Sequence, residues 1–301
     1  MPHSRFTRFA AATLVFNVGV VLFGAVVRAT GSGAGCGSHW PTCGGTAIPL
    51  SGTAERFIEF GHRASSGIAL ALVAILVVWA VRTRPSRDPV RLAAAAAGIL
   101  ILNEVLIGAA LVMFEWVADD RSAARAVSIT VHLVNTFLLL AALALTVWWS
   151  SGRPVPSRSP DRPTLWQVAI GAGALILVGA AGAVTALGDT LFPPEGLGGF
   201  EADPAGGFLV RLRWVHPILA VITAAYLVYL SRTLRVPEWM RSALGSLVVV
   251  QIGAGLLNVA LLAPVWMQLV HLLLADAVWI GFVVVGSTAL VQPARVEMVS
   301  A

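Results

Sequence analysis

Four histidines lie near the beginnings of long apolar segments, where an ionisable side chain is costly and usually serves a pathway or a cofactor. They are His62, His132, His216 and His271. Two imidazoles from facing helices suit haem, because the porphyrin already supplies four nitrogens to the iron, whereas zinc or copper takes three or four ligands from the protein. We therefore expect one porphyrin site for each of two histidine pairs. The alternative is that the imidazoles only form hydrogen bonds between helices; His3 and His39 are assigned no role.

An acidic residue accompanies the first of these histidines. Glu59 stands three residues before His62, so that both side chains share one face of a helix. The corresponding stretch of the second half, 212–214, contains no acid. A carboxylate beside an iron site could exchange protons during a reaction. Its alternative role is an ion pair with Arg63 or Arg56.

Two further acids fall within apolar segments. Glu104 lies in the third segment and Asp276 in the eighth. Acids at this depth serve either a functional site or hydrogen bonds between helices, and the sequence leaves both roles open for these two.

A short polar loop contains both cysteines of the chain, Cys36 and Cys43. Glycine and proline between them allow the loop to turn, so a mutual disulfide is sterically reasonable on the oxidising side of a membrane. The disulfide could only clip the loop, or it could be a dithiol that exchanges with an external oxidoreductase. A zinc site is less favoured, because His39 would add only a third ligand.

Composition indicates which elements position these residues. The chain has 301 residues, of which 57% are apolar and 12% charged, against about 45–50% and 25% in a soluble domain. Apolar runs near the length that crosses a bilayer recur throughout, which excludes nucleic-acid binding as the main role despite a net charge of +5. We predict an all-α integral membrane protein with eight transmembrane helices, at approximately 10–28, 58–81, 92–114, 127–149, 165–187, 212–231, 242–262 and 266–291.

Orientation follows from the basic residues, all 20 of which are arginine. If the N-terminus is cytoplasmic, most arginines fall in the inner segments and the acidic residues lean to the outer ones, as the positive-inside rule requires. Both termini are then cytoplasmic, and the cysteine loop lies on the outer face of the membrane.

The chain also repeats itself. Gly24-Ala25-Val26 and Gly182-Ala183-Val184 each precede a polar outer loop, and each loop leads into a helix that begins near a histidine. Four helices separate the two copies, so the copies have the same orientation. We predict two tandem four-helix bundles of parallel orientation, formed by halves 1–152 and 153–301, with the Pro/Ser/Arg stretch 151–163 between them.

These motifs together are similar to those of a known family. They are Gly24-Ala25-Val26-Val27-Arg28-Ala29-Thr30-Gly31-Ser32-Gly33, Cys36-Gly37-Ser38-His39-Trp40-Pro41-Thr42-Cys43, Glu59-Phe60-Gly61-His62-Arg63, His132, Val215-His216-Pro217 and His271. The pattern runs over essentially the whole chain. It resembles haem A synthase, in the form with a cysteine-bearing loop that is found in Gram-positive and related bacteria.

The resemblance implies oxidation of the C8 methyl of haem O to a formyl group, which yields haem A. Two successive hydroxylations would give a gem-diol that loses water. The resemblance also implies that His62 and His132 address the substrate haem. It makes His216 and His271 the axial ligands of a permanent haem b, and Glu59 the essential acid of the substrate site.

Partners and location are implied in the same way. A haem O synthase would supply the substrate, terminal oxidases would receive the product, and the protein would lie in the bacterial plasma membrane. The electron donor is not indicated by any residue. The alternatives are a dihaem b-type carrier of electrons from quinol, which gives Glu59 no task, and a haem or metal transporter, which predicts no tightly bound haem.

Overall fold

The computed structural model describes residues 5–157, 159–192 and 212–291. Within these ranges, eight α-helices are long and apolar enough to cross a membrane. They are α1 (Arg5–Ala29), α2 (Ala54–Thr83), α3 (Pro89–Met113), α4 (Ala123–Ser150), α5 (Arg162–Leu191), α7 (Val215–Thr233), α8 (Glu238–Ala260) and α9 (Val265–Ala289). Two short 3-10 helices, η1 (Ser32–Ala34) and η2 (Leu212–Trp214), precede α2 and α7. The prediction of an all-α membrane protein with eight spans is confirmed.

The helix ends differ from the predicted ends by a few residues, because capping fixes where a helix begins while apolarity fixes only the part that meets hydrocarbon. The side chain of Asp88 accepts a hydrogen bond from the Val90 N–H, and α3 begins at Pro89. The side chain of Asp161 accepts one from the Thr164 N–H, so α5 begins at Arg162. Both starts lie three residues before the predicted ones.

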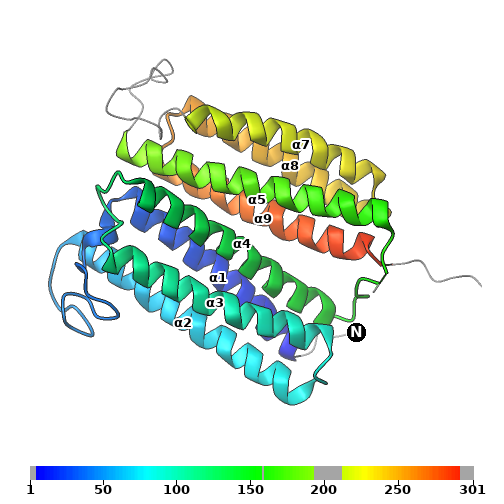
Figure 1. Cartoon of the computed structure of the whole chain (residues 1–301), viewed down its shortest axis with the longest axis horizontal. Helices are drawn as coiled ribbons and strands as arrows, with labels where there is room; N and C mark the ends of the chain where they lie inside the picture. Colours follow the sequence, from blue (N-terminus) through cyan, green and yellow to red (C-terminus); the bar gives the residue numbers. More distant parts are fainter. Residues whose placement is uncertain (1–4, 158, 193–211, 292–301) are drawn as a thin grey trace, which may run out of the picture.

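Two groups of four helices lie side by side (Figure 1). In the N-terminal group, α1 contacts α2, α2 contacts α3, α3 contacts α4, and α4 contacts α1. In the C-terminal group, α5, α7, α8 and α9 contact one another in the same cyclic order. Consequently α2 and α4 stand opposite each other across one ring, and α7 and α9 across the other. The division at residue 152 and the common orientation of the two halves stay predictions.

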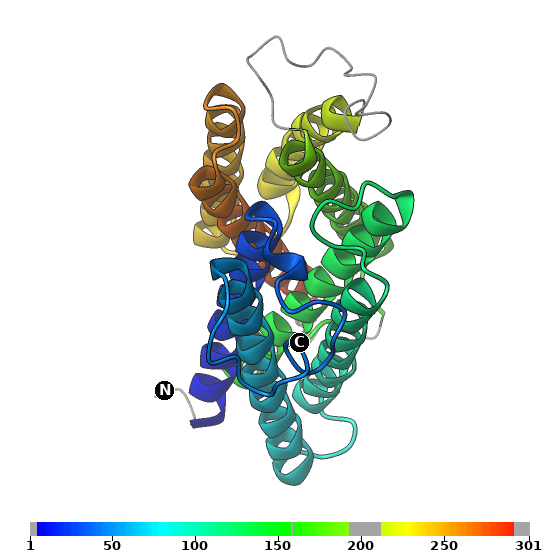
Figure 2. The same ribbon diagram turned by 90° about the vertical axis from the view of Figure 1, so that its left-hand side faces the viewer.

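The beginning of α1 and the end of α9 lie at one end of the helix array, and the loop between α1 and α2 lies at the other (Figure 1). Figure 2 views the array from the end that carries this loop. The assignment of that end to the outer face of the membrane stays a prediction.

Aromatic contacts join the two groups along α4 and α9. The rings of Phe137 and Trp279 stack with centroids 5.2 Å apart, and Nε1 of Trp279 donates to the carbonyl oxygen of Phe137 at 2.6 Å. Near the C-terminal ends of α4 and α9, Nε1 of Trp149 donates to Oγ of Ser287 at 3.1 Å. Phe137 and Trp279 belong to one apolar cluster, which contains buried residues of α4, α7, α8 and α9. The two groups therefore share part of one core.

A charged side chain joins the groups at the end of α1. Arg28 donates to the carbonyl oxygen of Ala186 at 2.6 Å and to Oγ1 of Thr190 at 2.5 Å, both on α5. It also donates to Oε1 of Gln268 on α9 at 2.8 Å. One guanidinium from the N-terminal group thus binds two helices of the C-terminal group.

Candidate functional site

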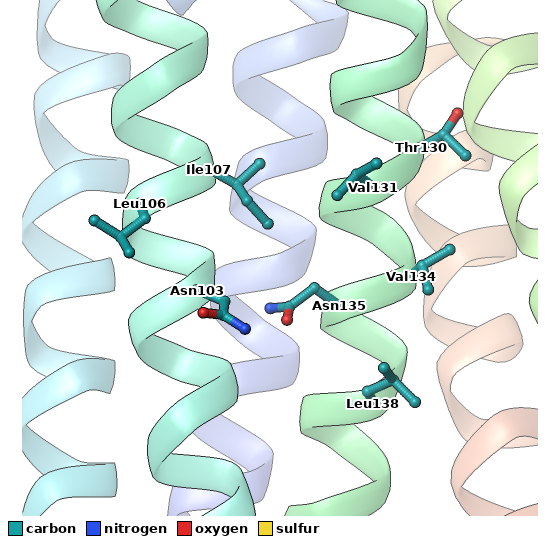
Figure 3. A pocket seen from close by; sticks show the side chains of 8 residues that line it. All are labelled: Asn103, Leu106, Ile107, Thr130, Val131, Val134, Asn135 and Leu138. Atoms are coloured by element: carbon teal, nitrogen blue, oxygen red, sulfur yellow. The ribbon is translucent and has the colours of Figure 1, made fainter.

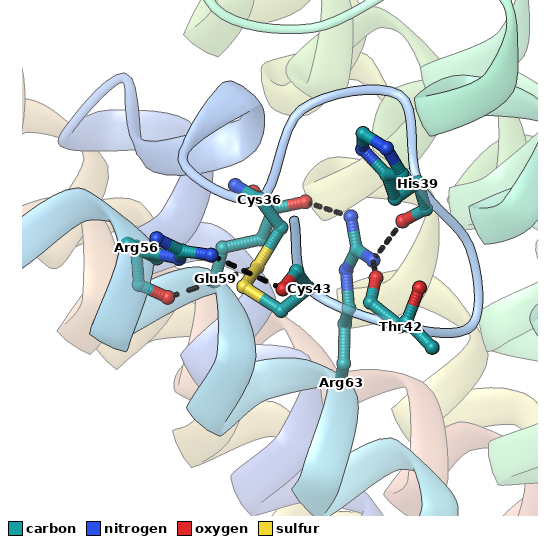
Figure 4. A network of polar contacts seen from close by, with 7 residues as sticks. All are labelled: Cys36, His39, Thr42, Cys43, Arg56, Glu59 and Arg63. Carbon is teal, nitrogen blue, oxygen red and sulfur yellow. Dashed lines mark hydrogen bonds and ion pairs between the residues drawn. A yellow bond between two sulfur atoms is a disulfide. The ribbon is translucent and has the colours of Figure 1, made fainter. Parts of the chain in front are cut away.

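The two cysteines form the predicted disulfide, with their Cα atoms 4.4 Å apart. The carbonyl oxygen of Cys43 accepts a hydrogen bond from Nη2 of Arg56 at 3.2 Å. In the described part of the chain, no group of three or more histidine, cysteine or acidic side chains could hold a metal ion. The cysteine loop is therefore closed by its own disulfide and fastened to α2 by Arg56 (Figure 4).

Glu59 lies beneath this loop and is 3% exposed. Its Oε2 accepts the backbone N–H of Cys36 at 2.6 Å, and its Oε1 accepts Nη2 of Arg63 at 2.5 Å. The same guanidinium donates to the carbonyl oxygens of His39 and Thr42. Of the two ion pairs that the sequence allowed, the one with Arg63 is present. The hydrogen bond between Glu59 and Cys36 could not be predicted from the local sequence pattern, because 23 residues separate the two partners.

His62 packs against α1. Its ring makes an edge contact with Phe23, with centroids 5.8 Å apart. A Cβ added to Gly24 would lie 3.1 Å from Cε1 of His62. The absence of a side chain at position 24 therefore makes room for the imidazole ring. Nδ1 of His62 is buried and has no hydrogen-bond partner among the described residues. His132 lies on α4, which stands opposite α2 in the ring of four helices.

His132 faces an acid on α3. Its Nδ1 lies in close contact with Oε2 of Glu104. The other oxygen of Glu104 accepts Nδ2 of Asn135 at 2.9 Å and Oγ1 of Thr136 at 2.8 Å. Glu104 therefore belongs to the surroundings of a candidate ligand, a role that the sequence left open because the two residues lie on different helices.

The second histidine pair lies on α7 and α9. The rings of His216 and His271 have centroids 6.3 Å apart and planes at 86°. Nδ1 of His216 lies 3.1 Å from the carbonyl oxygen of Val178, an arrangement typical of metal-binding histidines, in which the other ring nitrogen holds the metal. Two imidazoles on opposite sides of one metal, with bonds of about 2 Å, have ring centres about 6 Å apart. The pair therefore fits a bis-histidine haem iron.

Glycines make room for this pair as well. A Cβ added to Gly182 of α5 or to Gly255 of α8 would lie 3.0 Å from Cε1 of His216 or of His271, respectively. Nδ1 of His271 is buried without a hydrogen-bond partner in the described ranges. Three of the four candidate ligands thus rest against a glycine of a neighbouring helix. This repeated arrangement supports a common role for them.

Asp276 on α9 differs from the other acids. It is 1% exposed, and neither of its carboxylate oxygens has a hydrogen-bond partner in the part of the chain that the structure describes. The structure brings it into no contact with a candidate ligand.

A groove of about 400 Å³ opens between α3 and α4 (Figure 3). Its walls are mostly aliphatic, and the amides of Asn103 and Asn135 point toward one another across it. Asn135 also donates to Glu104. A second groove, of about 310 Å³, lies between α1 and α2 and is lined by Phe23 and Ser65. Both grooves lie in the N-terminal group.

Comparisons with known proteins relate the chain to a family and to named relatives. The COX15-CtaA family model, described as cytochrome oxidase assembly protein, matches residues 7–283. A protein from Thermus thermophilus named "Protoheme IX farnesyltransferase" is 49% identical over 306 residues, which cover 98% of this chain and 50% of that protein.

Two shorter similarities are to proteins with a different printed name. "Heme A synthase" of Alkalihalophilus pseudofirmus is 38% identical over 112 residues, 37% of this chain and 38% of that protein. "Heme A synthase" of Lysinibacillus sphaericus is 35% identical over 148 residues, 49% of this chain and 48% of that protein. The chain spans about half the length or less of these curated relatives. The chain belongs to the COX15-CtaA family of cytochrome oxidase assembly proteins.

Proposed function

We propose that this protein oxidises the C8 methyl of haem O to a formyl group and so produces haem A. One observation carries the proposal: the two histidine pairs have unequal surroundings. Carboxylates accompany the first pair, since Glu104 contacts His132 and Glu59 lies one helical turn from His62. The second pair contacts a backbone carbonyl and an amide side chain. Proton-transferring groups are needed where a methyl group is oxidised, but not where electrons merely pass.

The printed names of the relatives support the substrate. Two proteins named "Heme A synthase" match at 38% and 35% identity. Two Thermus proteins named "Protoheme IX farnesyltransferase" match at 49% identity along half their length. Transfer of a farnesyl group to protohaem yields a farnesylated haem, which is the substrate proposed here. We therefore infer that a haem O synthase supplies the substrate and that terminal oxidases receive the product.

In this proposal the C-terminal group holds haem b through Nε2 of His216 and through His271. Haem b supplies reversible one-electron transfer when it is bound. The contact of His216 Nδ1 with Val178 would orient the ring. Gly182 and Gly255 would keep the helix backbones close to the two imidazoles.

In the N-terminal group, His62 and His132 would bind the substrate haem from α2 and α4. Glu59 would accept and return protons, or orient water, while the methyl carbon is hydroxylated twice. Each hydroxylation takes one oxygen atom from O2 and two electrons from an external donor and releases the other oxygen atom as water, and the resulting gem-diol then loses water to leave the formyl group. Arg63 and the N–H of Cys36 hold its carboxylate in place. The loop and its disulfide would then serve the reaction by positioning Glu59 and by covering the site on the predicted outer face.

A dihaem electron carrier is the second candidate, because the spacing of His216 and His271 would serve it equally well. Expression of the full chain together with a haem O source, followed by chromatography of the extracted haems, separates the two functions. Our proposal predicts haem A that depends on this chain. Recovery of haem O and haem b alone would support the carrier.

A further inference from the structure

Glu104 and His132 form the closest acid–histidine contact among the candidate ligands. Glu104 lies on α3 and His132 on α4, and Oε2 of the acid meets Nδ1 of the ring. Their side chains are 12% and 33% exposed. The contact is therefore partly buried within the N-terminal group, and the carboxylate is better covered than the ring.

The carboxylate of Glu104 is oriented by its other contacts. Its Oε1 accepts hydrogen bonds from Nδ2 of Asn135 and Oγ1 of Thr136, at 2.9 and 2.8 Å. Asn135 is held in turn by the carbonyl oxygen of Leu100 at 2.9 Å. Two donors on Oε1 leave Oε2 facing Nδ1 of His132, in a close contact that does not have hydrogen-bond geometry in this structure. The ring then presents its other nitrogen, Nε2, as a metal ligand.

The C-terminal group places an uncharged side chain at the corresponding position. Glu104 precedes Gly108 on α3 by four residues, and Gln251 precedes Gly255 on α8 by four residues. Nε2 of Gln251 lies 3.5 Å from Nε2 of His271. In both groups the side chain at this position approaches the histidine of the next helix. Glu104 brings a carboxylate to Nδ1 of His132, whereas Gln251 brings an amide to Nε2 of His271.

We propose that Glu104 is a positioning residue that fixes the ring of His132 and makes it a stronger electron donor to the iron of the substrate haem. This inference rests on the proposed function. A carboxylate that accepts the second ring proton raises the basicity of the ligating nitrogen. A more basic axial ligand favours the oxidised iron and lowers its reduction potential. The amide of Gln251 would not have this effect on the other haem.

The test compares the reduction potentials of the two haems in the purified full chain, loaded with haem O under anaerobic conditions. The wild type is compared with Glu104→Gln, which keeps the shape of the side chain and removes its charge. Glu115→Gln is the matched control, because Glu115 is exposed in the loop after α3. Loss of one signal in His62→Ala identifies the haem of the N-terminal group.

In Glu104→Gln, we expect the potential of the N-terminal haem to become more positive and the g values of its ferric form to change. The potential of the other haem and both potentials of Glu115→Gln should equal those of the wild type. An unchanged N-terminal potential and spectrum in Glu104→Gln would overturn the inference and leave the proposed function intact. Failure of the wild type to bind haem O would instead contradict the proposed function.

If Glu104→Gln loses the N-terminal haem altogether, Glu104→Asp decides the matter. That variant retains a carboxylate, so it should recover haem binding together with the low potential. Binding that is not recovered, or that is recovered equally by Glu104→Ala, would show that the charge of Glu104 does not act on His132.

Discussion

The backbone N–H of Cys36 donates to Oε2 of Glu59 at 2.6 Å, which places a disulfide-bonded residue in direct contact with the proposed catalytic acid. Arg63 strengthens the link, because it binds Oε1 of Glu59 and two carbonyl oxygens of the same loop. The conformation of the cysteine loop and the position of the carboxylate are therefore coupled.

This coupling predicts that loss of the disulfide affects both stability and reaction. Closure of a loop with a sequence separation of 7 stabilises a fold by about 2–3 kcal/mol through the entropy of the unfolded chain. The Cys36→Ser/Cys43→Ser variant should unfold at lower temperature and form less haem A, while its haem b content stays that of the wild type. Thermal unfolding in detergent and haem chromatography measure these effects. Unchanged product yield would show that the disulfide does not position Glu59.

Replacement of Glu59 tests its chemical role. Glu59→Gln should retain both haems and lower the rate of formyl formation by about 100-fold or more, the usual cost of losing a general acid or base. Glu55→Gln is the control, because Glu55 lies one turn earlier on α2 and is exposed. Haem A yields are compared after expression with a haem O source. Equal yields from Glu59→Gln and Glu55→Gln would refute the assignment.

The glycines beside the histidines provide a test of the haem b site. In Gly255→Val, the new Cβ would lie 3.0 Å from Cε1 of His271, so the ring must move from its position. Displacing an axial ligand in this way should weaken haem b binding by about tenfold or more. Gly253→Val is the matched control, since its Cβ would meet no atom within 4 Å. Haem b content per chain is measured by optical spectroscopy, and equal content in the two variants would contradict the proposed site.

Arg28 allows a test of the contact between the two helix groups. Arg28→Leu removes the donors to Thr190, to Gln268 and to the carbonyl oxygen of Ala186. A hydrogen bond to a charged group contributes about 1.5–3 kcal/mol, so the variant should be clearly less stable to heat. Arg82→Leu replaces an exposed arginine of α2 and should be neutral. Equal melting temperatures would show that Arg28 does not join the groups.

Much of the fold could be predicted from the sequence, because a bilayer sets the length of each apolar segment and leaves few alternatives to a helix. The helix beginnings were less accurate, since they depend on caps such as Asp88 and Asp161 that lie outside the apolar runs. The disulfide was predicted correctly from the spacing and the loop composition of Cys36 and Cys43.

The contacts between helices could not be predicted in the same way. Glu59 was placed beside His62 by helical periodicity, but its bond to Cys36 depends on how the loop folds back over α2. The contact of Glu104 with His132 depends on the relative rotation of α3 and α4. Apolar segments of a membrane protein carry little signal for such rotation, because lipid-facing and buried positions are both apolar.

The most direct test of the account is a conversion experiment on the purified full chain with one equivalent of haem O. The wild type is loaded with haem O without oxygen, then given a reductant and oxygen, and the haems are extracted and separated by chromatography. The account predicts that haem O is converted to haem A while the haem b held by His216 and His271 is recovered unchanged. Recovery of all haem O unchanged, although both haems are reduced and reoxidised, would contradict it and would identify an electron carrier.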